Sequence, residues 1–263
     1  MPADPTPELT RRYDRDALAY RQLWAPVLRP AGRRLLREFA PRAVERALDV
    51  GAGVGSLFTD WKELCPSASV VGVDRSPGIL ALAPVAMPRV IADARGLPFP
   101  AASVDLVTLI FMLFHLPDPQ SALLEARRVI RPGGAVGTLT WSTELASVAH
   151  TLWTDCLDAH GAPPPDPATA ARHESVDTPE KMEALLRAAG FLTTRAWAGE
   201  LACTLEIESL IELKTRMGSE RMRFDGLTES SREACVAAAR RGLATLAPSD
   251  FAARATIVYA VAN

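Results

Sequence analysis

The chain has 263 residues, of which 48% are hydrophobic and 23% charged, and its formal net charge at pH 7 is -2. That length is sufficient for one large α/β domain with a sizeable core. Because the charge is nearly balanced and no long block carries one sign, we expect a small-molecule partner and neither nucleic acid nor an anionic membrane. The charged N-terminus lacks the apolar run of a secretory signal, and no stretch approaches the roughly 18 apolar residues of a membrane span, so the sequence predicts a cytoplasmic protein.

The cysteines and histidines form no disulfide or metal pattern. The four cysteines, at positions 65, 156, 203 and 235, are scattered without a Cys-x-x-Cys pair, which is typical of buried thiols in a reducing compartment. No group of histidines and carboxylates has the spacing of metal ligands, so we expect no metal site.

The first forty residues are predicted to be mostly helical. Residues 1–10 contain three prolines and little apolar material, which predicts a frayed tail. From Arg11 the apolar residues fall near helical spacing until Pro26 stops the run. A second helix is expected over Gly32–Phe39.

A glycine-rich turn follows the first predicted strand. Arg46–Val50 leads into Gly-Ala-Gly-Val-Gly-Ser, and the amphipathic stretch Leu57–Leu64 comes next. Glycines let the backbone turn tightly and approach a ligand closely, and a helix that begins there presents free N–H groups. A dinucleotide fingerprint would need glycine at the position of Ser56, so the pattern is Gly-x-Gly-x-Gly instead.

Three further apolar runs predict the rest of a parallel sheet. Ser69–Asp74 ends in an acid that would emerge beside the ligand crevice and accept the two hydroxyls of a ribose; the alternative is that Asp74 caps the helix predicted over Ser76–Leu82. Val90–Asp93 also ends in an acid, and Ser103–Phe111 is apolar enough for a central strand.

The remaining elements are predicted from periodicity and from proline and glycine signals. A helix from Pro119 is expected to end at Pro132-Gly-Gly134, and a stiff proline loop is expected over Pro163–Pro167. A basic and flexible patch, Arg216–Asp225, is expected to join the last two helices. The other predicted strands are Ala135–Trp141, Phe191–Trp197 and Ala255–Val261, and the other helices are Val148–Ala159, Pro179–Ala189, Glu206–Met217 and Ser230–Leu246.

The glycine turn, led by Asp49 and followed by Asp74, resembles motif I of the class I S-adenosylmethionine-dependent methyltransferases. The resemblance extends over about Tyr13–Trp141 and is closest to the small-molecule, ubiquinone/menaquinone-methyltransferase-like type 11 family. It includes the Tyr-Asp-x-x-Ala-x-x-Tyr start at Tyr13, the Asp93-Ala94 pair with its Leu-Pro-Phe continuation, and the late Leu-x-Glu-Ala-x-Arg-Val-x-x-Pro-Gly-Gly run.

The resemblance implies a Rossmann-like α/β fold. Its doubly wound sheet would have about seven strands, mostly parallel with an antiparallel last strand, plus a helical cap. Residues 1–40 would form an N-terminal helical lid, residues 41–145 the cofactor-binding core, and residues 146–263 the acceptor-side cap and the completion of the sheet.

The same resemblance implies S-adenosylmethionine as the cofactor. Asp49 would orient the methionine amino group, the glycines would admit the methionine portion, Asp74 would hold the ribose, and Asp93 with Ala94 the adenine. The rings of the two lid tyrosines could face the sulfonium cation; the alternative is that they are ordinary half-buried aromatics. The predicted cofactor-binding residues are Tyr13, Tyr20, Asp49, Gly51, Gly53, Gly55, Asp74, Arg75, Asp93, Ala94 and Phe111.

His115 is the candidate catalytic residue. It lies in a segment that resembles the family's Leu-His-His-x-x-Asp motif, although Phe114 replaces the first histidine. A histidine there could act as a general base, and the alternative is a purely packing role. Trp141, His150 and His173 are further residues to test for contact with the acceptor.

Three functions remain open from the sequence. The first is methyl transfer to oxygen, nitrogen or carbon of a small organic acceptor. The second is a nicotinamide-dependent oxidoreductase, which shares Asp74 and a glycine turn but is disfavoured by Ser56. The third is a non-methylating relative that keeps the cofactor pocket as a scaffold. The chain is expected to be a monomer or a homodimer.

Overall fold

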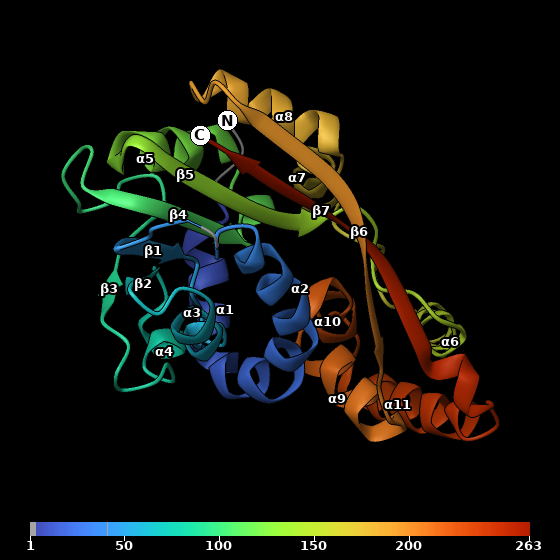
Figure 1. Cartoon of the computed structure of the whole chain (residues 1–263). Helices are drawn as coiled ribbons and strands as arrows, with labels where there is room; N and C mark the ends of the chain where they lie inside the picture. Colours follow the sequence, from blue (N-terminus) through green and yellow to red (C-terminus); the bar gives the residue numbers. More distant parts are fainter. Residues whose placement is uncertain (1–3, 41) are drawn as a thin grey trace.

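The computed structural model describes residues 4–40 and 42–263. The described residues form a seven-stranded sheet in the order β3-β2-β1-β4-β5-β7-β6, with helices on both faces (Figure 1). Neighbouring strands from β3 to β5 pair in parallel, whereas β7 is antiparallel to both β5 and β6. The strands are β1 Arg46–Val50, β2 Ser69–Asp74, β3 Arg89–Ile91, β4 Val104–Ile110, β5 Ile130–Trp141, β6 Thr194–Thr204 and β7 Ala252–Ala262. The predicted fold class is thereby confirmed.

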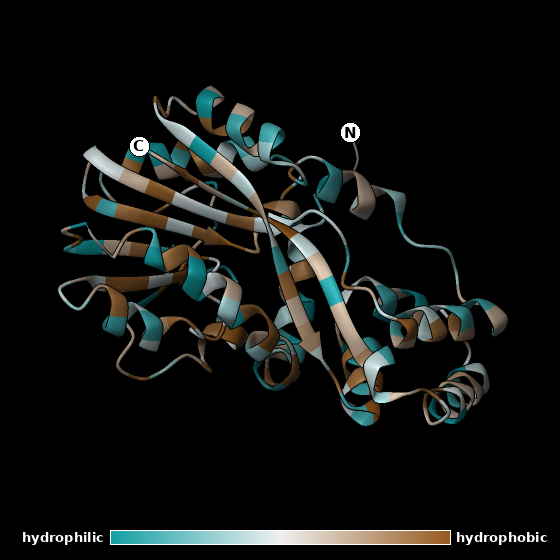
Figure 2. Cartoon of the chain, turned by 45° about the vertical axis from the view of Figure 1, so that its right-hand side comes forward, coloured by the Kyte–Doolittle hydropathy of each residue, from teal (hydrophilic) through white to brown (hydrophobic). Residues whose placement is uncertain are grey.

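The helices bring the chain back across the sheet between strands. Helices α5 and α8 lie on one face and α2 on the other, and the strands between them are largely hydrophobic (Figures 1 and 2). The α-helices are α1 Thr6–Ala19, α2 Ala25–Arg37, α3 Phe58–Leu64, α4 Pro77–Leu80, α5 Pro119–Val129, α6 Val148–Ala159, α7 Pro167–Glu174, α8 Pro179–Ala188, α9 Ile207–Arg216, α10 Gly218–Asp225 and α11 Glu229–Leu243. Short helices of other types are the π-helix η1 Tyr20–Trp24 and the 3-10 helices η2 Leu113–His115 and η3 Pro248–Phe251.

The central strand is β4, as its apolar sequence predicts. Its residues are buried from Val104 to Leu109, and β1 and β5 flank it on either side. A parallel strand that is covered by helices on both faces favours apolar residues at most positions, not only at alternate ones; its two buried polar residues, Asp105 and Thr108, are hydrogen-bonded.

The last two strands form a ribbon that is longer than the rest of the sheet. All of β6 pairs with β7, from Thr194 opposite Ala262 to Thr204 opposite Ala252, whereas β5 pairs only with residues 257–262 of β7. The unshared half of the ribbon extends toward α6, α9 and α11 (Figure 1). The prediction of a last strand inserted into the sheet is confirmed, but β6 begins later and runs further than the predicted Phe191–Trp197.

The N-terminal prediction of a frayed tail is wrong for the described residues. Helix α1 begins at Thr6, and the side chains of Thr6 and Leu9 are buried; residues 1–3 lie outside the described residues. Pro26 does not stop the helix either, because the chain stays helical from Thr6 to Arg37. The π-helical turn η1 shifts the hydrogen-bond register just before Pro26, so its missing N–H falls in the first turn of α2. The helix predicted from Gly32 is the second half of α2.

Three predictions in the second half of the chain also need correction. Pro167 does not stay in a loop: it begins α7, where a first-turn proline is tolerated, and Asp166 caps the helix. The patch predicted to be flexible contains α10. Strand β5 begins at Ile130, before the Pro-Gly-Gly sequence, because Ile130 pairs with Val104 and a bulge accommodates the next four residues before Ala135.

The buried residues form one large cluster around the sheet and a second one in the C-terminal helices. The second cluster joins α6, α9, α10 and α11 through side chains that include Trp153, Ile211, Phe224 and Cys235. We call these four helices the helical cap. None of the described helices has the length and apolar character needed to cross a membrane.

Helix α1 is fastened to the start of α4 by Asp14. One carboxylate oxygen of Asp14 accepts the hydroxyl of Ser76 at 2.6 Å and the backbone N–H of Gly78 at 2.7 Å. The two helices touch so closely that a Cβ on Gly78 would lie 2.8 Å from that oxygen and 2.9 Å from the Asp14 Cα. Only glycine fits this contact.

Substituting Gly78→Ala is therefore expected to push α1 away from α4. Forcing one extra carbon into a packed contact costs ~1–3 kcal/mol, so the denaturant midpoint of unfolding should fall. The matched control is Gly96→Ala, because nothing lies within 4 Å of a Cβ at Gly96. Equal midpoints for the two variants would contradict the contact.

Candidate active site

The glycine turn forms the floor of a small cavity at the carboxyl end of β1. Gly51, Gly53 and Gly55 have φ angles of 76°, 56° and 66°, a conformation that L side chains rarely adopt. A Cβ on Gly51 would lie 2.8 Å from the Cβ of Met112. Gly51 and Gly53 line the cavity, which has a volume of about 80 Å³, whereas Gly55 packs under Ala83 and Met87 and does not line it.

Asp74 ties the end of β2 to this turn. Its Oδ2 accepts the backbone N–H of Gly53 at 2.9 Å, and its Oδ1 accepts the N–H of Ser76 at 3.0 Å. Burial raises the pKa of Asp74, and the two N–H groups act against that rise. Because each carboxylate oxygen can accept a second hydrogen bond, Asp74 can both hold the turn and bind a ligand in the cavity that it lines.

Asp49 lies beneath the cavity rather than in its wall. Its side chain is buried and accepts the hydroxyl of Thr108 at 2.8 Å on the neighbouring strand. Burial raises the pKa of Asp49 to about 6, and the nearby charge of Asp74 adds to this effect. Asp49 can interact with a ligand in the cavity through a bridging water, or directly after a small shift of the turn.

Asp93 and Ala94 line the opposite side of the cavity. Asp93 accepts three hydrogen bonds from Arg95, through its backbone N–H and two guanidinium nitrogens, and these hold its pKa low. Arg75 also lines the cavity, and its buried Nη1 has no hydrogen-bond partner among the described residues. Burial lowers the pKa of Arg75. An unpartnered guanidinium nitrogen at a cavity wall favours a ligand with an acceptor atom.

Helix α1 and the π-helix η1 cover the cavity with aromatic side chains. Tyr13 and Tyr20 lie edge to face, with ring centroids 5.8 Å apart, and both line the cavity. The hydroxyl of Tyr13 hydrogen-bonds to Nε2 of His115 at 2.9 Å. Burial raises the pKa of Tyr13 to about 12 and lowers that of His115 well below its usual range, so both are neutral near pH 7.

A second cavity, of about 840 Å³, lies on the other side of these aromatic residues. It is enclosed by α1, η1, α7, α9 and α10, and Trp24, Phe114, Trp141 and His173 contribute aromatic walls. Five residues line both cavities and therefore form the boundary between them: Leu9, Tyr13, Tyr20, Phe111 and His115. Phe111 has a φ of 52°, which is unusual for a residue with a Cβ, and its ring lies against Trp141 with centroids 4.9 Å apart.

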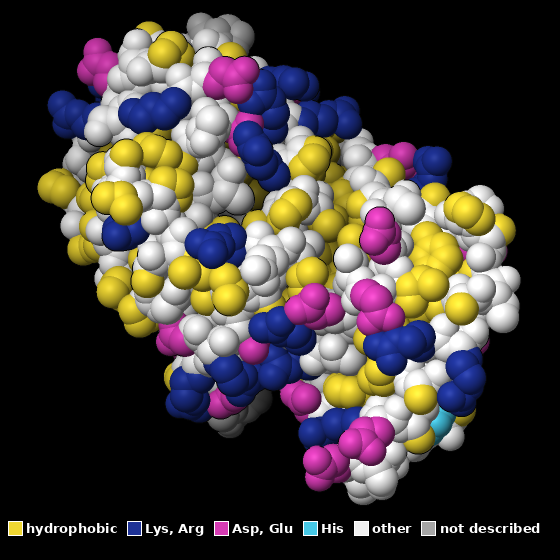
Figure 3. Space-filling model, turned by 90° about the horizontal axis from the view of Figure 1, so that it is seen from below, with side chains coloured by type: hydrophobic (Ala, Val, Ile, Leu, Met, Phe, Trp, Pro, Cys, Tyr) yellow, Lys and Arg dark blue, Asp and Glu magenta, His cyan; other side chains and the backbone are white. Residues whose placement is uncertain are grey.

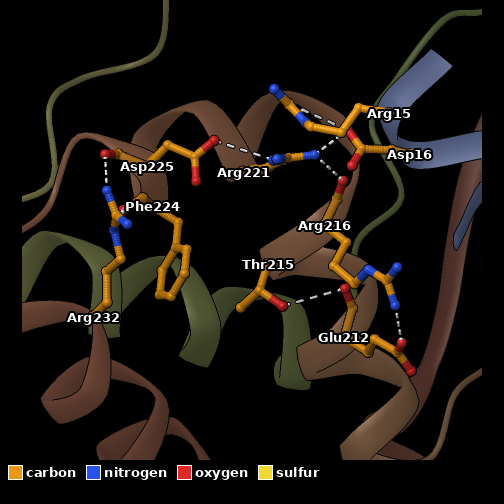
Figure 4. Close-up of polar contacts among 9 residues, drawn as sticks. All are labelled: Arg15, Asp16, Glu212, Thr215, Arg216, Arg221, Phe224, Asp225 and Arg232. Atoms are coloured by element: carbon orange, nitrogen blue, oxygen red, sulfur yellow. Dashed lines mark hydrogen bonds and ion pairs between the residues drawn. The ribbon is translucent and has the colours of Figure 1, made fainter. Parts of the chain in front are cut away.

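Arg221 joins α1 to the helical cap beside the large cavity, which its partners Asp16 and Asp225 line. Its guanidinium contacts Asp16 of α1, Asp225 of α10 and the backbone carbonyl of Arg216 (Figure 4). Asp16 and Arg221 are both largely buried, at 10% and 13% side-chain exposure, so this ion pair is shielded from solvent.

The chain resembles known methyltransferases over much of its length. Residues 48–137 match a methyltransferase-domain family. An uncharacterized methyltransferase of Mycobacterium tuberculosis is 41% identical over 106 residues, which cover 39% of this chain and only 42% of that relative. The demethylmenaquinone methyltransferase of Deinococcus radiodurans is 32% identical over 198 residues, which cover 69% of this chain and 81% of that protein. The chain belongs to the class I S-adenosylmethionine-dependent methyltransferases.

Solved structures of methyltransferases share the fold of this chain. Phosphoethanolamine N-methyltransferase 2 of Haemonchus contortus, in complex with phosphomonomethylethanolamine and S-adenosylhomocysteine, matches with a TM-score of 0.54 at 18% identity. The match covers 95% of this chain and 57% of that one. Membership of the family agrees with the predicted resemblance and leaves the nicotinamide oxidoreductase without support.

Several contacts around the two cavities were not predicted from the sequence. Asp14 follows Tyr13 in the lid motif, but its role in fastening α1 to α4 depends on a contact across 64 positions of the chain. Asp16 and Arg221 are 205 positions apart in the chain, so no local sequence pattern predicts their contact. No metal-ligating cluster of His, Cys, Asp or Glu occurs in the described part of the methyltransferase.

His150 and His173, which were candidates for acceptor contact, both line the large cavity with Trp141. Burial lowers the pKa of each histidine, that of His150 from 6.5 to about 3. Between about pH 3 and pH 6.5 the unfolded chain binds a proton on His150 that the folded chain does not bind. Stability is therefore lost as the pH falls from about 6.5, by up to ~1.4 kcal/mol per pH unit for one such group.

Replacing His150→Phe is expected to make the decrease in Tm between pH 7 and pH 5 shallower than in the wild type. Thermal unfolding at several pH values measures this. Asp49, whose raised pKa of about 6 acts in the opposite direction, is present in both proteins and cancels in the comparison. Parallel Tm profiles would contradict the assignment of a neutral, buried His150.

Proposed function

We propose that the chain is an S-adenosylmethionine-dependent methyltransferase that acts on a small organic acceptor. One observation carries the proposal: the small cavity with the predicted cofactor residues and the large cavity share a wall that includes Tyr13, Phe111 and His115. A donor in one cavity and an acceptor in the other would meet at that wall. The large cavity, at about 840 Å³, is within the ~300–1,000 Å³ range of small-molecule sites.

The residues of the small cavity fit the chemistry of the cofactor. Gly51 and Gly53 let backbone approach the ligand, Asp74 has lone pairs left for two ribose hydroxyls, and Arg75 offers an unpartnered nitrogen. Asp93 and Ala94 would bind the adenine. When bound, S-adenosylmethionine supplies a methyl group that its sulfonium centre has already activated, so the chain mainly has to align a nucleophile.

A nucleoside needs more room than the small cavity provides. Its volume is about 80 Å³, well under the ~300 Å³ at which typical ligand pockets begin. Because α1 and η1 cover it through Tyr13 and Tyr20, we infer that these helices move outward when the cofactor enters. The hydrogen bonds that Ser76 and Gly78 donate to Asp14 would then have to break for α1 to move.

His115 and Tyr13 are proposed to position the acceptor and remove its proton. His115 is neutral, hydrogen-bonds to Tyr13 and lines both cavities. A neutral imidazole can accept a proton from an acceptor hydroxyl or amine during methyl transfer. The aromatic walls around Trp24 and Trp141, together with relatives named demethylmenaquinone methyltransferases, support an acceptor that contains a flat ring.

The face of the molecule seen in Figure 3 carries acidic and basic side chains close together rather than a large patch of one sign. An even distribution of this kind gives no attraction for a polyanion. It supports the choice of a small molecule over nucleic acid as the acceptor.

Calorimetric titration with S-adenosylmethionine and S-adenosylhomocysteine, beside a nicotinamide dinucleotide control, tests the cofactor. Mass spectrometry after incubation with a panel of hydroxylated and aminated aromatic compounds tests the transfer. We expect binding of both sulfur compounds and a gain of one methyl group on an acceptor. No binding of either sulfur compound would overturn the proposal, and binding without any transfer would favour the scaffold alternative.

A further inference from the structure

A polar group lies in the wall of the large cavity where the helical cap closes it. His150 comes from α6, Lys214 from α9 and Glu220 from α10, and all three line the cavity. Lys214 and Glu220 form an ion pair with side-chain exposures of 13% and 15%, and Thr154 donates to Glu220 at 3.0 Å. The charge of Lys214 is thus already balanced.

His150 is the member of this group with a buried polar atom that has neither a hydrogen bond nor an ion pair among the described residues. It is only 5% exposed, and its Nε2 has no hydrogen-bond partner among the described residues. Its Nδ1 lies 2.8 Å from the Oγ of Ser147, which also accepts the backbone N–H of His150. If the Ser147 hydroxyl donates its hydrogen bond to an unprotonated Nδ1, both groups are satisfied and Nε2 carries the single ring proton.

The opposite tautomer is less favourable. If Nδ1 carried the proton, it would donate to Ser147, and the Ser147 hydroxyl proton would have no described acceptor. The neutral ring therefore carries a buried N–H at Nε2 in a residue that lines the cavity, and a buried donor without a partner is costly. A ligand atom that accepts this hydrogen bond removes that cost.

We propose that His150 is a specificity-determining residue that donates a hydrogen bond from Nε2 to a carbonyl oxygen of the methyl acceptor. A neutral carbonyl suits the site better than a carboxylate, because Glu220 already balances Lys214 and a further negative charge would be unpaired. That the bound compound is the methyl acceptor rests on the proposed function, whereas the hydrogen-bonding site itself does not. The acceptor class is a ring compound with a ketone, quinone or amide oxygen.

Binding of two matched compounds tests the site in the absence of the cofactor. 1-Indanone has a ketone, and indane has the same bicyclic skeleton without it. We expect 1-indanone to bind the wild type ~10-fold more tightly than indane in titrations followed by tryptophan fluorescence. The variant His150→Phe should lose this preference, whereas His160→Phe should keep it, because His160 lies at the end of the same helix and does not line the cavity.

Three outcomes would overturn the proposal: equal binding of the two compounds to the wild type, an unchanged preference in His150→Phe, or tighter binding of indane-1-carboxylate than of 1-indanone. Nitrogen-15 NMR of the wild-type histidine ring provides a measurement that needs no variant. We expect the proton on Nε2 and a shift of that nitrogen with 1-indanone; a proton on Nδ1 would contradict the site. Neither measurement uses S-adenosylmethionine, so a failure of cofactor binding is recognised separately.

Discussion

Replacing Asp74→Asn is expected to weaken S-adenosylmethionine binding by ~10- to 100-fold, because hydrogen bonds to a charged group contribute ~1.5–3 kcal/mol. The carboxylate holds the N–H groups of Gly53 and Ser76, one on each oxygen. An amide has only one oxygen, so one of these N–H groups loses its partner and the ribose hydroxyls meet a weaker acceptor. Isothermal titration calorimetry measures the loss.

Asp118→Asn is the matched control for this experiment. Asp118 also accepts a backbone N–H, from Gln120 at 3.0 Å, but it caps α5 and lines neither cavity. Its substitution should leave cofactor affinity unchanged. If Asp74→Asn binds S-adenosylmethionine as tightly as the wild type, Asp74 holds only the turn and the capping interpretation is correct.

Removing the hydroxyl of Tyr13 is expected to lower kcat without weakening cofactor binding. The change Tyr13→Phe deletes the hydrogen bond to Nε2 of His115 and leaves the aromatic ring in place. Because positioned acid–base groups contribute ~10²–10⁴-fold, kcat should fall by at least ~10-fold once the base is free to rotate. Steady-state kinetics with an acceptor found in the screen gives kcat, and calorimetry gives the affinity for S-adenosylmethionine.

Tyr259→Phe provides the control, since Tyr259 lies in β7 and lines neither cavity. The pH profile adds a second test. Because burial keeps His115 neutral far below its usual pKa and raises the pKa of Tyr13 to about 12, kcat should be constant between about pH 6 and pH 9. A kcat that falls with a midpoint near pH 6.5 would contradict a His115 that burial keeps neutral, and a kcat that Tyr13→Phe leaves unchanged would indicate that His115 only packs.

Predictions from local sequence were most accurate in the sheet. Arg46–Val50 and Ser69–Asp74 form strands with the predicted bounds, and the run ending at Phe111 is the central strand. Continuous apolar runs between glycine turns have few other stable arrangements in a sheet that is covered on both faces. Most of the residues predicted to bind the cofactor meet in one cavity for the same reason, since the carboxyl ends of parallel strands share one edge.

Predictions based on proline and on low apolar content failed where packing outweighed local preference. The chain remains helical through Pro26, and Pro167 begins a helix instead of standing in a loop. The patch Arg216–Asp225 was predicted to be flexible but contains α10, where Arg221 contacts Asp16 of α1 and Phe224 packs in the helical cap. Local propensity is a weak guide where tertiary contacts are this extensive.

The sequence by itself determined the fold class and the family and indicated most of the residues that gather in the small cavity, because a strand, a glycine turn and strand-end acids are local patterns whose chemistry is set within about 25 residues, as from Asp49 to Asp74. Only the tertiary structure decided which residues line the large cavity. Tyr13 meets His115 across 102 positions, and His150, Lys214 and Glu220 reach one cavity from three different helices. Such contacts arise from how the helices pack on one another, and no local pattern records them.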